Sequence, residues 1–176
     1  MKKNYSLKAA IICIMLIIGF ITQGWAQNEE IIYQTGFEAS EGFIATQTYN
    51  NTTPYLSGTT VQQWGSVYGT PSTTSPIIGG QSMQMRWYYS SAPNTFGYAY
   101  TNFDLANVTK VNFYAASTNS VNVIVSYSTD GGTTYVGDST IILTGSSTLY
   151  TYHVSTNGSY GSVRVKFTVS LPTPVP

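Results

Sequence analysis

Hydrophobic and polar residues alternate one by one in several short stretches of the chain. The strictest alternation covers residues 163–169, where Val and Phe at the odd positions are separated by Arg164, Lys166 and Thr168. Residues 111–115 and 121–127 show the same pattern. A period of two places one face of a β-strand in a core and the other in water. No stretch after residue 27 has the period of an amphipathic helix, so the pattern predicts strands alone.

Further runs rich in β-branched and aromatic residues also predict strands. They cover residues 31–35, 43–47, 61–68, 82–89, 97–103, 139–143 and 150–154. Four prolines lie between the runs, where a missing N–H costs no ladder hydrogen bond: Pro54, Pro71, Pro76 and Pro93. Residues 48–80 are expected to form long loops around Trp64. About ten strands without a helix predict an all-β fold, an antiparallel two-sheet β-sandwich.

The N-terminus has the features of a secretory signal peptide. Three lysines among the first eight residues precede an apolar run over residues 9–21, and small residues follow at Gly24 and Ala26. The run is shorter than the roughly 20 residues that a membrane-spanning helix needs. We therefore expect cleavage after Ala26 and a secreted protein that is extracellular or at the cell surface. The alternative location is the periplasm. The predicted organisation is a signal peptide at 1–26, a β-sandwich domain at 27–170 and a Pro-rich C-terminal tail at 171–176.

Charge and composition exclude several classes of function. After residue 26 the chain holds four basic and seven acidic residues, a net charge of about −3. No basic stripe remains, which argues against nucleic acid and, once the signal peptide is gone, against a membrane surface. The chain has one histidine, His153, and its one cysteine, Cys13, lies in the signal peptide. Without a His-rich zinc site or a Cys–His nucleophile, the sequence predicts a non-catalytic protein.

The most specific short pattern is Ser128-Thr129-Asp130-Gly131-Gly132-Thr133-Thr134-Tyr135. It resembles the Asp-box, S-x-D-x-G-x-T-aromatic, found on hairpins of sialidase-like propellers and of many secreted β-domains. An Asp side chain can accept hydrogen bonds from backbone N–H groups two residues on, and glycine tolerates a positive φ. A propeller would carry several copies, whereas this chain has one. We interpret the motif as a hairpin turn that joins a strand at 121–128 to one at 135–143.

The aromatic residues give the best indication of function. If the strands at 82–89 and 97–103 pair through the loop at 90–96, alternation places one polar and aromatic set on a single outward surface. That set is Gln84, Arg86, Tyr88, Tyr98 and Tyr100, and Trp64 would extend it from a loop. Flat rings can cover the C–H faces of a sugar while neighbouring polar groups bond its hydroxyls. The alternative is that these rings are ordinary cross-strand pairs, which stabilise a sheet by about 0.2–1 kcal/mol each.

Five segments in order resemble jelly-roll β-sandwich modules of secreted bacterial proteins, both carbohydrate-binding-module-like and adhesin-associated domains. They are Gly36-Phe37-Glu38 with Gly42-Phe43, Gln81-Ser82-Met83-Gln84-Met85-Arg86, Asn102-Phe103-Asp104-Leu105, Tyr127-Ser128-Thr129-Asp130-Gly131-Gly132 and Val163-Arg164-Val165-Lys166-Phe167. The resemblance spans about residues 31–170. It implies a jelly-roll topology and a non-catalytic module of the kind attached to larger secreted enzymes or surface proteins.

The same resemblance raises two further expectations. Such modules tend to end in a strand that pairs beside the first, whereas this sequence runs into Pro172, Pro174 and Pro176. The resemblance therefore leads us to expect a jelly roll that lacks its last strand, with an edge completed by another chain or by a continuation of this one. Related sandwiches often hold a structural calcium between a Glu after the first strand and an Asp of the last. Glu38 matches the first ligand, and nothing in the sequence matches the second. Because calcium takes six to eight oxygen ligands, Glu38 alone does not define a site.

Together these observations predict a secreted, non-catalytic β-sandwich that binds a glycan or a cell-surface polysaccharide. The candidate binding residues are Trp64, Gln84, Arg86, Tyr88, Tyr98 and Tyr100, and Glu38 is the candidate calcium ligand. The alternative is a structural or adhesive domain without a small-molecule ligand, as a fragment of a larger secreted protein or with an edge-strand partner.

Overall fold

The computed structural model describes residues 30–46, 49, 55–74, 77–86, 96–143, 145–154 and 161–172. The chain divides into two compact units, Met1–Ile31 and Ile32–Pro176, and every described strand belongs to the second. The predicted signal peptide and residues 173–176 of the predicted tail lie outside the described residues. Within the described ranges, no helix has the length and apolar character needed to cross a membrane.

Strands and a single helical turn make up the regular structure of the described residues. In chain order the elements are η1 (Ala39–Glu41), β1 (Tyr55–Thr59), β2 (Gln62–Val67), β3 (Gly69–Ser72), β4 (Ser82–Met85), β5 (Tyr98–Thr101), β6 (Lys110–Ala115), β7 (Val121–Ser128), β8 (Val136–Leu143), β9 (Thr148–His153) and β10 (Arg164–Ser170). The helical turn η1 is a 3-10 helix of three residues. All strand pairs are antiparallel, which confirms the predicted all-β class.

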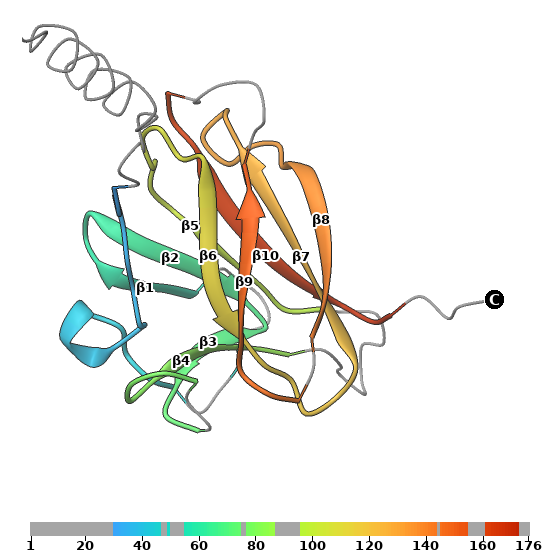
Figure 1. The fold of residues 1–176 in the computed structure, drawn as a ribbon. Coiled ribbons are helices and arrows are strands. Elements are labelled where there is room, and N and C mark those ends of the chain that lie inside the picture. Colours follow the sequence, from blue (N-terminus) through green and yellow to red (C-terminus); the bar gives the residue numbers. More distant parts are fainter. Residues whose placement is uncertain are drawn as a thin grey trace, which may run out of the picture. The chain divides into compact units, whose positions relative to one another are not determined.

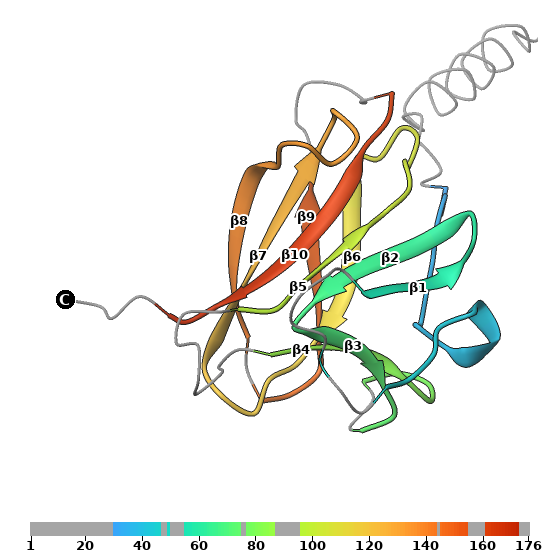
Figure 2. The same cartoon turned by 180° about the vertical axis from the view of Figure 1, so that it is seen from behind.

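The strands form one large sheet and two small ones. The six-stranded sheet has the order β1-β2-β5-β10-β7-β8, while β3 pairs with β4 and β6 pairs with β9 (Figure 2). Two small two-stranded sheets therefore accompany the large one within the described residues. The strand β10 lies between β5 and β7, so β1 and β8 form the edges of the large sheet.

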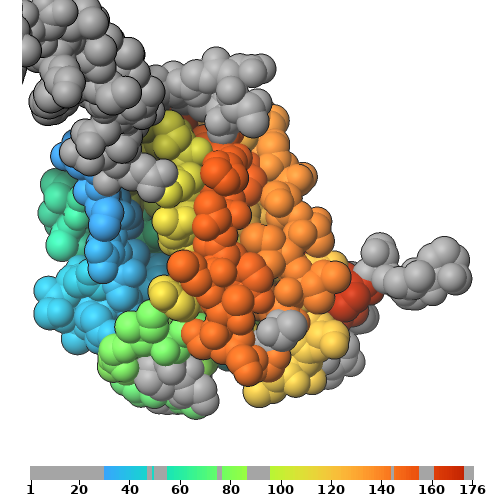
Figure 3. Space-filling view, viewed as in Figure 1, coloured from blue at the N-terminus to red at the C-terminus, as the bar shows by residue number. Residues whose placement is uncertain are grey.

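The core lies between the six-stranded sheet and the pair β6–β9, which runs in front of it in Figure 1. Alternate valines of β7 and β10, such as Val125 and Val165, point inward and are buried. They pack with Val111 and Phe113 of β6 and with Tyr152 of β9. Burial of apolar surface stabilises the fold by roughly 25 cal/mol per Å². Because the two layers share this interior, the arrangement is consistent with a β-sandwich. Figure 3 shows β6 and β9 side by side on the face away from the core.

A second core cluster lies under the N-terminal part of the unit. Phe43, Trp64 and Ala99 are its buried residues, and Phe37 and Phe167 pack against them. The segment that precedes β1 is held here by hydrogen bonds to β1 rather than by a ladder. The Gly58 N–H donates to the Gly42 carbonyl at 3.2 Å, and the Ile44 N–H donates to Ser57 Oγ at 3.1 Å.

Several predicted strand positions are wrong, each for a local reason. Residues 31–35 form no strand, because the Glu41 carboxylate accepts the N–H groups of Gly36 and Glu38 and turns the chain. The predicted strand at 61–68 is confirmed as β2, but the long loops expected within residues 48–80 give way to two further strands, β1 and β3. Pro71 lies inside β3 opposite Met83. A two-stranded sheet leaves one side of each strand without a ladder, so proline is tolerated there.

Candidate functional site

Two tyrosines and two cations project from the outer face of the six-stranded sheet. In β5, Ala99 and Thr101 are each 1% exposed and face the core, so Tyr98 and Tyr100 face outward. In β10, Val165 is buried, so its neighbours Arg164 and Lys166 face outward. The register pairs Lys166 with Tyr100. Strand pairing therefore brings together residues that lie more than 60 positions apart in the sequence.

Lys166 lies over two aromatic rings. Its Nζ is 4.4 Å from the ring centroid of Tyr98 and 5.1 Å from that of Tyr135. The Tyr98 and Tyr100 centroids are 6.2 Å apart, with the rings tilted by 36°. An ammonium over a tyrosine ring is attracted by the negative face of the ring, by about 0.5–1 kcal/mol at an exposed site. The rings therefore hold the ammonium over the sheet without using its hydrogen-bond donors.

Gly65 of β2 makes room for the ring of Tyr100. The two residues are cross-strand partners, and Gly65 is buried. A Cβ added to Gly65 would lie 2.3 Å from Cζ and 2.5 Å from the hydroxyl oxygen of Tyr100. The ring therefore lies directly over the glycine, at a distance that no other residue type permits. A glycine inside a strand often marks such a close approach.

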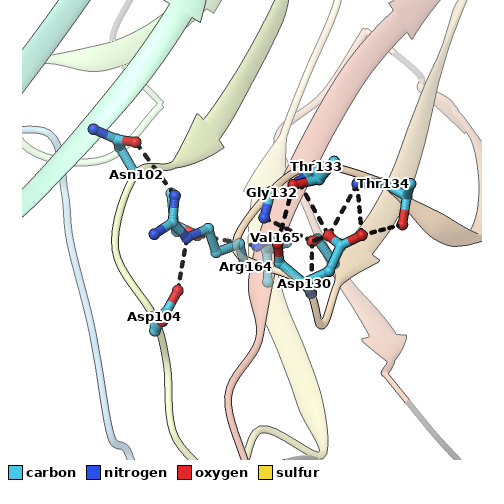
Figure 4. A network of polar contacts seen from close by, with 10 residues as sticks. Asn102, Asp104, Asp130, Gly132, Thr133, Thr134, Arg164 and Val165 are labelled. Carbon is cyan, nitrogen blue, oxygen red and sulfur yellow. Dashed lines mark hydrogen bonds and ion pairs between the residues drawn. The ribbon is translucent and has the colours of Figure 1, made fainter.

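The hairpin between β7 and β8 supplies the third tyrosine. Asp130 Oδ1 accepts the N–H groups of Thr133 at 3.0 Å and Thr134 at 2.9 Å, and Oδ2 accepts the Thr134 hydroxyl at 2.6 Å (Figure 4). The Ser128 hydroxyl donates to Oδ1 at 2.7 Å. These bonds fix the turn that ends at Tyr135. The structure confirms the prediction that this motif joins two antiparallel strands.

The charge of Asp130 is expected to stabilise the hairpin in a pH-dependent way. Hydrogen bonds from Thr134, then from Ser128 and Thr133, hold the pKa of Asp130 well below its usual range. A depressed pKa adds stability above the unfolded-state value near pH 4, and this stability is lost as the pH falls toward the folded-state value. Asp130→Asn should lower the melting temperature at pH 7 and flatten its decline between about pH 4 and pH 2.

Thermal melts followed by circular dichroism at several pH values test this. Asp138→Asn is the matched control, because it replaces a carboxylate of β8 that lies outside this turn. Parallel pH profiles for the wild type and Asp130→Asn would show that the Asp130 carboxylate does not stabilise the turn.

Arg164, the first residue of β10, binds the segment that follows β5 and lies beside the tip of the hairpin. Its Nε donates to Asp104 Oδ1 at 2.7 Å, and its Nη1 donates to Asn102 Oδ1 at 3.4 Å (Figure 4). A Cβ placed on Gly132 would lie 3.4 Å from Arg164 Cδ and 3.3 Å from the Tyr135 hydroxyl oxygen. The tip of the hairpin therefore reaches across to Arg164 and closes one side of a depression.

This depression, called the tyrosine hollow below, has a volume of about 320 Å³. Its lining residues are Tyr98, Tyr100, Asn102, Gly131, Gly132, Tyr135, Arg164 and Lys166. Burial raises the pKa of Tyr100 and of Tyr135, so both hydroxyls stay protonated at neutral pH. The hollow thus offers ring faces, neutral hydroxyls and cationic N–H donors. This combination suits the binding of a polar ring compound.

The structure separates the residues that the sequence grouped together. Tyr98 and Tyr100 line the hollow, but β4 pairs with β3 and not with β5. Gln84 and Arg86 meet a different ring: the Tyr49 hydroxyl donates to Gln84 Oε1 at 3.4 Å, and Arg86 Cζ lies 4.4 Å from the Tyr49 centroid. Neither lines the tyrosine hollow. Tyr88 lies outside the described residues.

Trp64 does not extend an outer surface. It lies in β2 rather than in a loop, and it is 6% exposed. Its Nε1 donates to the Tyr33 hydroxyl at 2.9 Å, and its ring packs on Phe37 and Phe167. Its two sequence neighbours, Gln63 and Gly65, lie on the other face of the same strand.

Sequence reasoning missed six of the eight residues that line the hollow. The sequence pattern identified Arg164 and Lys166 as polar positions of one strand and Tyr135 as the end of a turn, but it assigned none of them to a binding site. The pattern placed both cations on the solvent face, which the structure confirms. What it lacked was the partner of β5, because the pairing of β5 with β10 joins distant segments.

Glu38 binds the loop before β4 by two hydrogen bonds. Its Oε1 accepts the backbone N–H groups of Gly80 at 2.7 Å and Gln81 at 3.3 Å. Among the described residues, no group of three or more His, Cys, Asp or Glu side chains is placed to hold a metal ion. A calcium ion at Glu38 stays a prediction.

Comparisons with protein-family models, with curated proteins and with solved structures found no match to this chain. The resemblance to secreted jelly-roll modules therefore stays a prediction. The geometry of the tyrosine hollow is the basis for the function proposed next.

Proposed function

We propose that this chain is a secreted, non-catalytic β-sandwich module that binds a glycan or cell-surface polysaccharide in the tyrosine hollow. One observation carries the proposal: three tyrosine rings, an asparagine and two cations converge on one hollow of about 320 Å³. Ligand pockets run from roughly 300 to 1,000 Å³, so this volume suits a single sugar ring of a longer chain.

The chemistry of the hollow matches a sugar better than an apolar ligand. A pyranose presents C–H groups on its faces and hydroxyls around its edge. Ring faces of Tyr98 and Tyr100 would cover the former, while Asn102, Arg164 and Lys166 would bond the latter. Protonated tyrosine hydroxyls add groups that both donate and accept.

The carboxylates near the hollow support a non-catalytic role. Glycosidases usually pair two carboxyl groups, one of which has a raised pKa and acts as an acid. Here Asp104 pairs with Arg164, and Asp130 is held by the hairpin. The pKa of each carboxyl is lowered, so neither is suited to donate a proton near neutral pH.

Chain path and leader sequence support the rest of the proposal. The chain crosses between layers on going from β5 to β6, from β6 to β7, from β8 to β9 and from β9 to β10. Such crossings are typical of jelly rolls and Greek-key sandwiches. Secretion rests on the lysines and apolar run of residues 1–26.

A structural or adhesive role is the second candidate. Within the described residues β8 is an edge strand of the large sheet, and its Ile142 is 66% exposed. Exposed apolar edges can pair with another chain. This role needs no contact with sugar in the tyrosine hollow, so changes in the hollow would leave it intact.

Affinity electrophoresis on a panel of soluble polysaccharides tests the proposal. Tyr98→Ala and Tyr135→Ala should each weaken binding by about tenfold or more, because a tyrosine that anchors an interface contributes about 1.4 kcal/mol or more. Tyr114→Ala is the matched control, since Tyr114 is 51% exposed on β6 in the other layer. Retention that is equal for the wild type and both hollow variants would refute glycan binding at this site.

A further inference from the structure

Lys166 carries a charge that no acidic side chain neutralises among the residues that the structure describes. The other cation of the tyrosine hollow, Arg164, forms an ion pair with Asp104, whereas the described contacts of Lys166 Nζ are with the rings of Tyr98 and Tyr135. Of the seven acidic residues in the sequence, six are described, and none of the six lies within 4 Å of Nζ. The seventh, Glu29, lies outside the described residues.

The position of this ammonium is determined by the fold rather than by a flexible surface chain. Lys166 is in the centre of β10, with β5 on one side and β7 on the other. The two rings hold it at the edge of the hollow by attraction to their negative faces. An ammonium has three N–H donors, and a ring face engages the charge without consuming them. The donors remain for a ligand.

The nearby carboxylates leave room for an acidic ligand. Asp104 is taken by Arg164, and the Asp130 oxygens are taken by Ser128, Thr133 and Thr134. Neither carboxylate faces Nζ at ion-pair distance. Arg164 has five N–H donors and uses two of them in the bonds described above, so it can add donors to the same ligand.

We propose that the tyrosine hollow binds an acidic sugar, whose carboxylate or sulfate group pairs with the Lys166 ammonium while its ring lies against the tyrosines. This inference rests on the proposed function of glycan binding and narrows it to one class of ligand. A neutral sugar would leave a positive charge unpaired beside the ligand. An acidic sugar uses every group that lines the hollow.

Titration calorimetry with matched pairs of sugars tests the proposal. One pair is a galacturonate trisaccharide and its methyl ester, and the other is a sulfated and an unsulfated dextran oligosaccharide. The acidic member of at least one pair should bind about tenfold more tightly, as expected for one charge-assisted hydrogen bond. The pair that shows the preference identifies the acidic group. Raising sodium chloride from about 0.05 to 0.5 M should reduce the preference, because salt screens exposed charges.

Variants of Lys166 assign the preference to this residue. Lys166→Met should bring the ratio of the two affinities to about one, and Lys166→Arg, which keeps the charge, should restore most of it. Lys110→Met is the matched control, because Lys110 lies on β6 in the other layer. Melting temperatures of all variants verify that they fold.

The outcomes separate the two proposals. Equal affinity for both members of each pair, with binding that Tyr98→Ala still weakens by about tenfold or more, would overturn the acidic sugar and leave glycan binding intact. A preference that survives in Lys166→Met would also overturn it. Failure of all four sugars to bind would contradict glycan binding and the acidic ligand together.

Discussion

Replacing Trp64 by alanine is expected to lower the free energy of unfolding by about 3–5 kcal/mol. The indole is almost fully buried in the second core cluster. Its ring centroid lies 5.1 Å from that of Phe37 and 6.1 Å from that of Phe167, and its Nε1 donates to the Tyr33 hydroxyl. Truncation leaves a cavity between the sheet and the N-terminal segment and removes the partner of a half-buried hydroxyl.

Urea denaturation followed by circular dichroism measures this effect. Trp64→Phe is the matched control, since it keeps a ring in the cluster and loses only the N–H donor. It should cost clearly less than Trp64→Ala, by the difference between a partly filled site and an open cavity. A change within about 0.5 kcal/mol for Trp64→Ala is what an exposed loop residue would give, and it would place Trp64 outside the core.

Local pattern predicted the elements whose two faces differ strongly in polarity. In β10 the alternation of Val165 and Phe167 with Lys166 is unbroken, and the structure places them on opposite faces. The turn after β7 was predictable because Ser128 and Asp130 bond their own neighbours. In both cases the information lies within a few residues, where sequence spacing fixes the geometry.

Buried polar residues explain why β1 and β3 were missed and why Trp64, in β2, was expected to extend a surface from a loop. Ser57, Ser66 and Thr70 are almost completely buried, so the inner faces of these strands look as polar as loops. Their hydroxyls find partners inside the fold; Ser66 Oγ, for example, donates to the Gly69 carbonyl at 2.9 Å. Because Ser66 lies next to Trp64 on the same buried face of β2, apolar and polar residues do not alternate clearly along this strand.

Strand pairing was the part of the site that sequence alone did not reveal. Alternation states which face Tyr98 occupies but not which strand lies beside it. The nearest strand along the chain, β4, was the natural guess, and it pairs with β3 instead. The true neighbours, β2 and β10, bring Gly65 and Lys166 to the tyrosines.

Gly65→Ala is expected to reduce sugar binding by about tenfold or more while the fold is retained. The added methyl group would overlap the outer end of the Tyr100 ring, which is a side chain that can swing away. Backbone pairing of β2 with β5 can therefore persist, and alanine is tolerated within strands. The variant keeps every ring and every charge of the tyrosine hollow and changes only the position of the Tyr100 ring. A loss of binding would therefore show that the position of this ring, and not only its presence, is needed to bind the sugar. Gly161→Ala is the matched control, because a Cβ at Gly161 meets nothing within 4 Å.

The measurement closest to the central claim is a nuclear magnetic resonance titration of the wild type and Gly65→Ala with the tightest-binding oligosaccharide of the panel. For the wild type, the largest shifts should fall on the backbone amides of 98–102, 131–135 and 164–166, and they should weaken or vanish in Gly65→Ala with its melting temperature nearly unchanged. Shifts centred on β3 and β4 around Gln84 and Arg86, or shifts of equal size in both proteins, would contradict the claim that the tyrosine hollow is the binding surface.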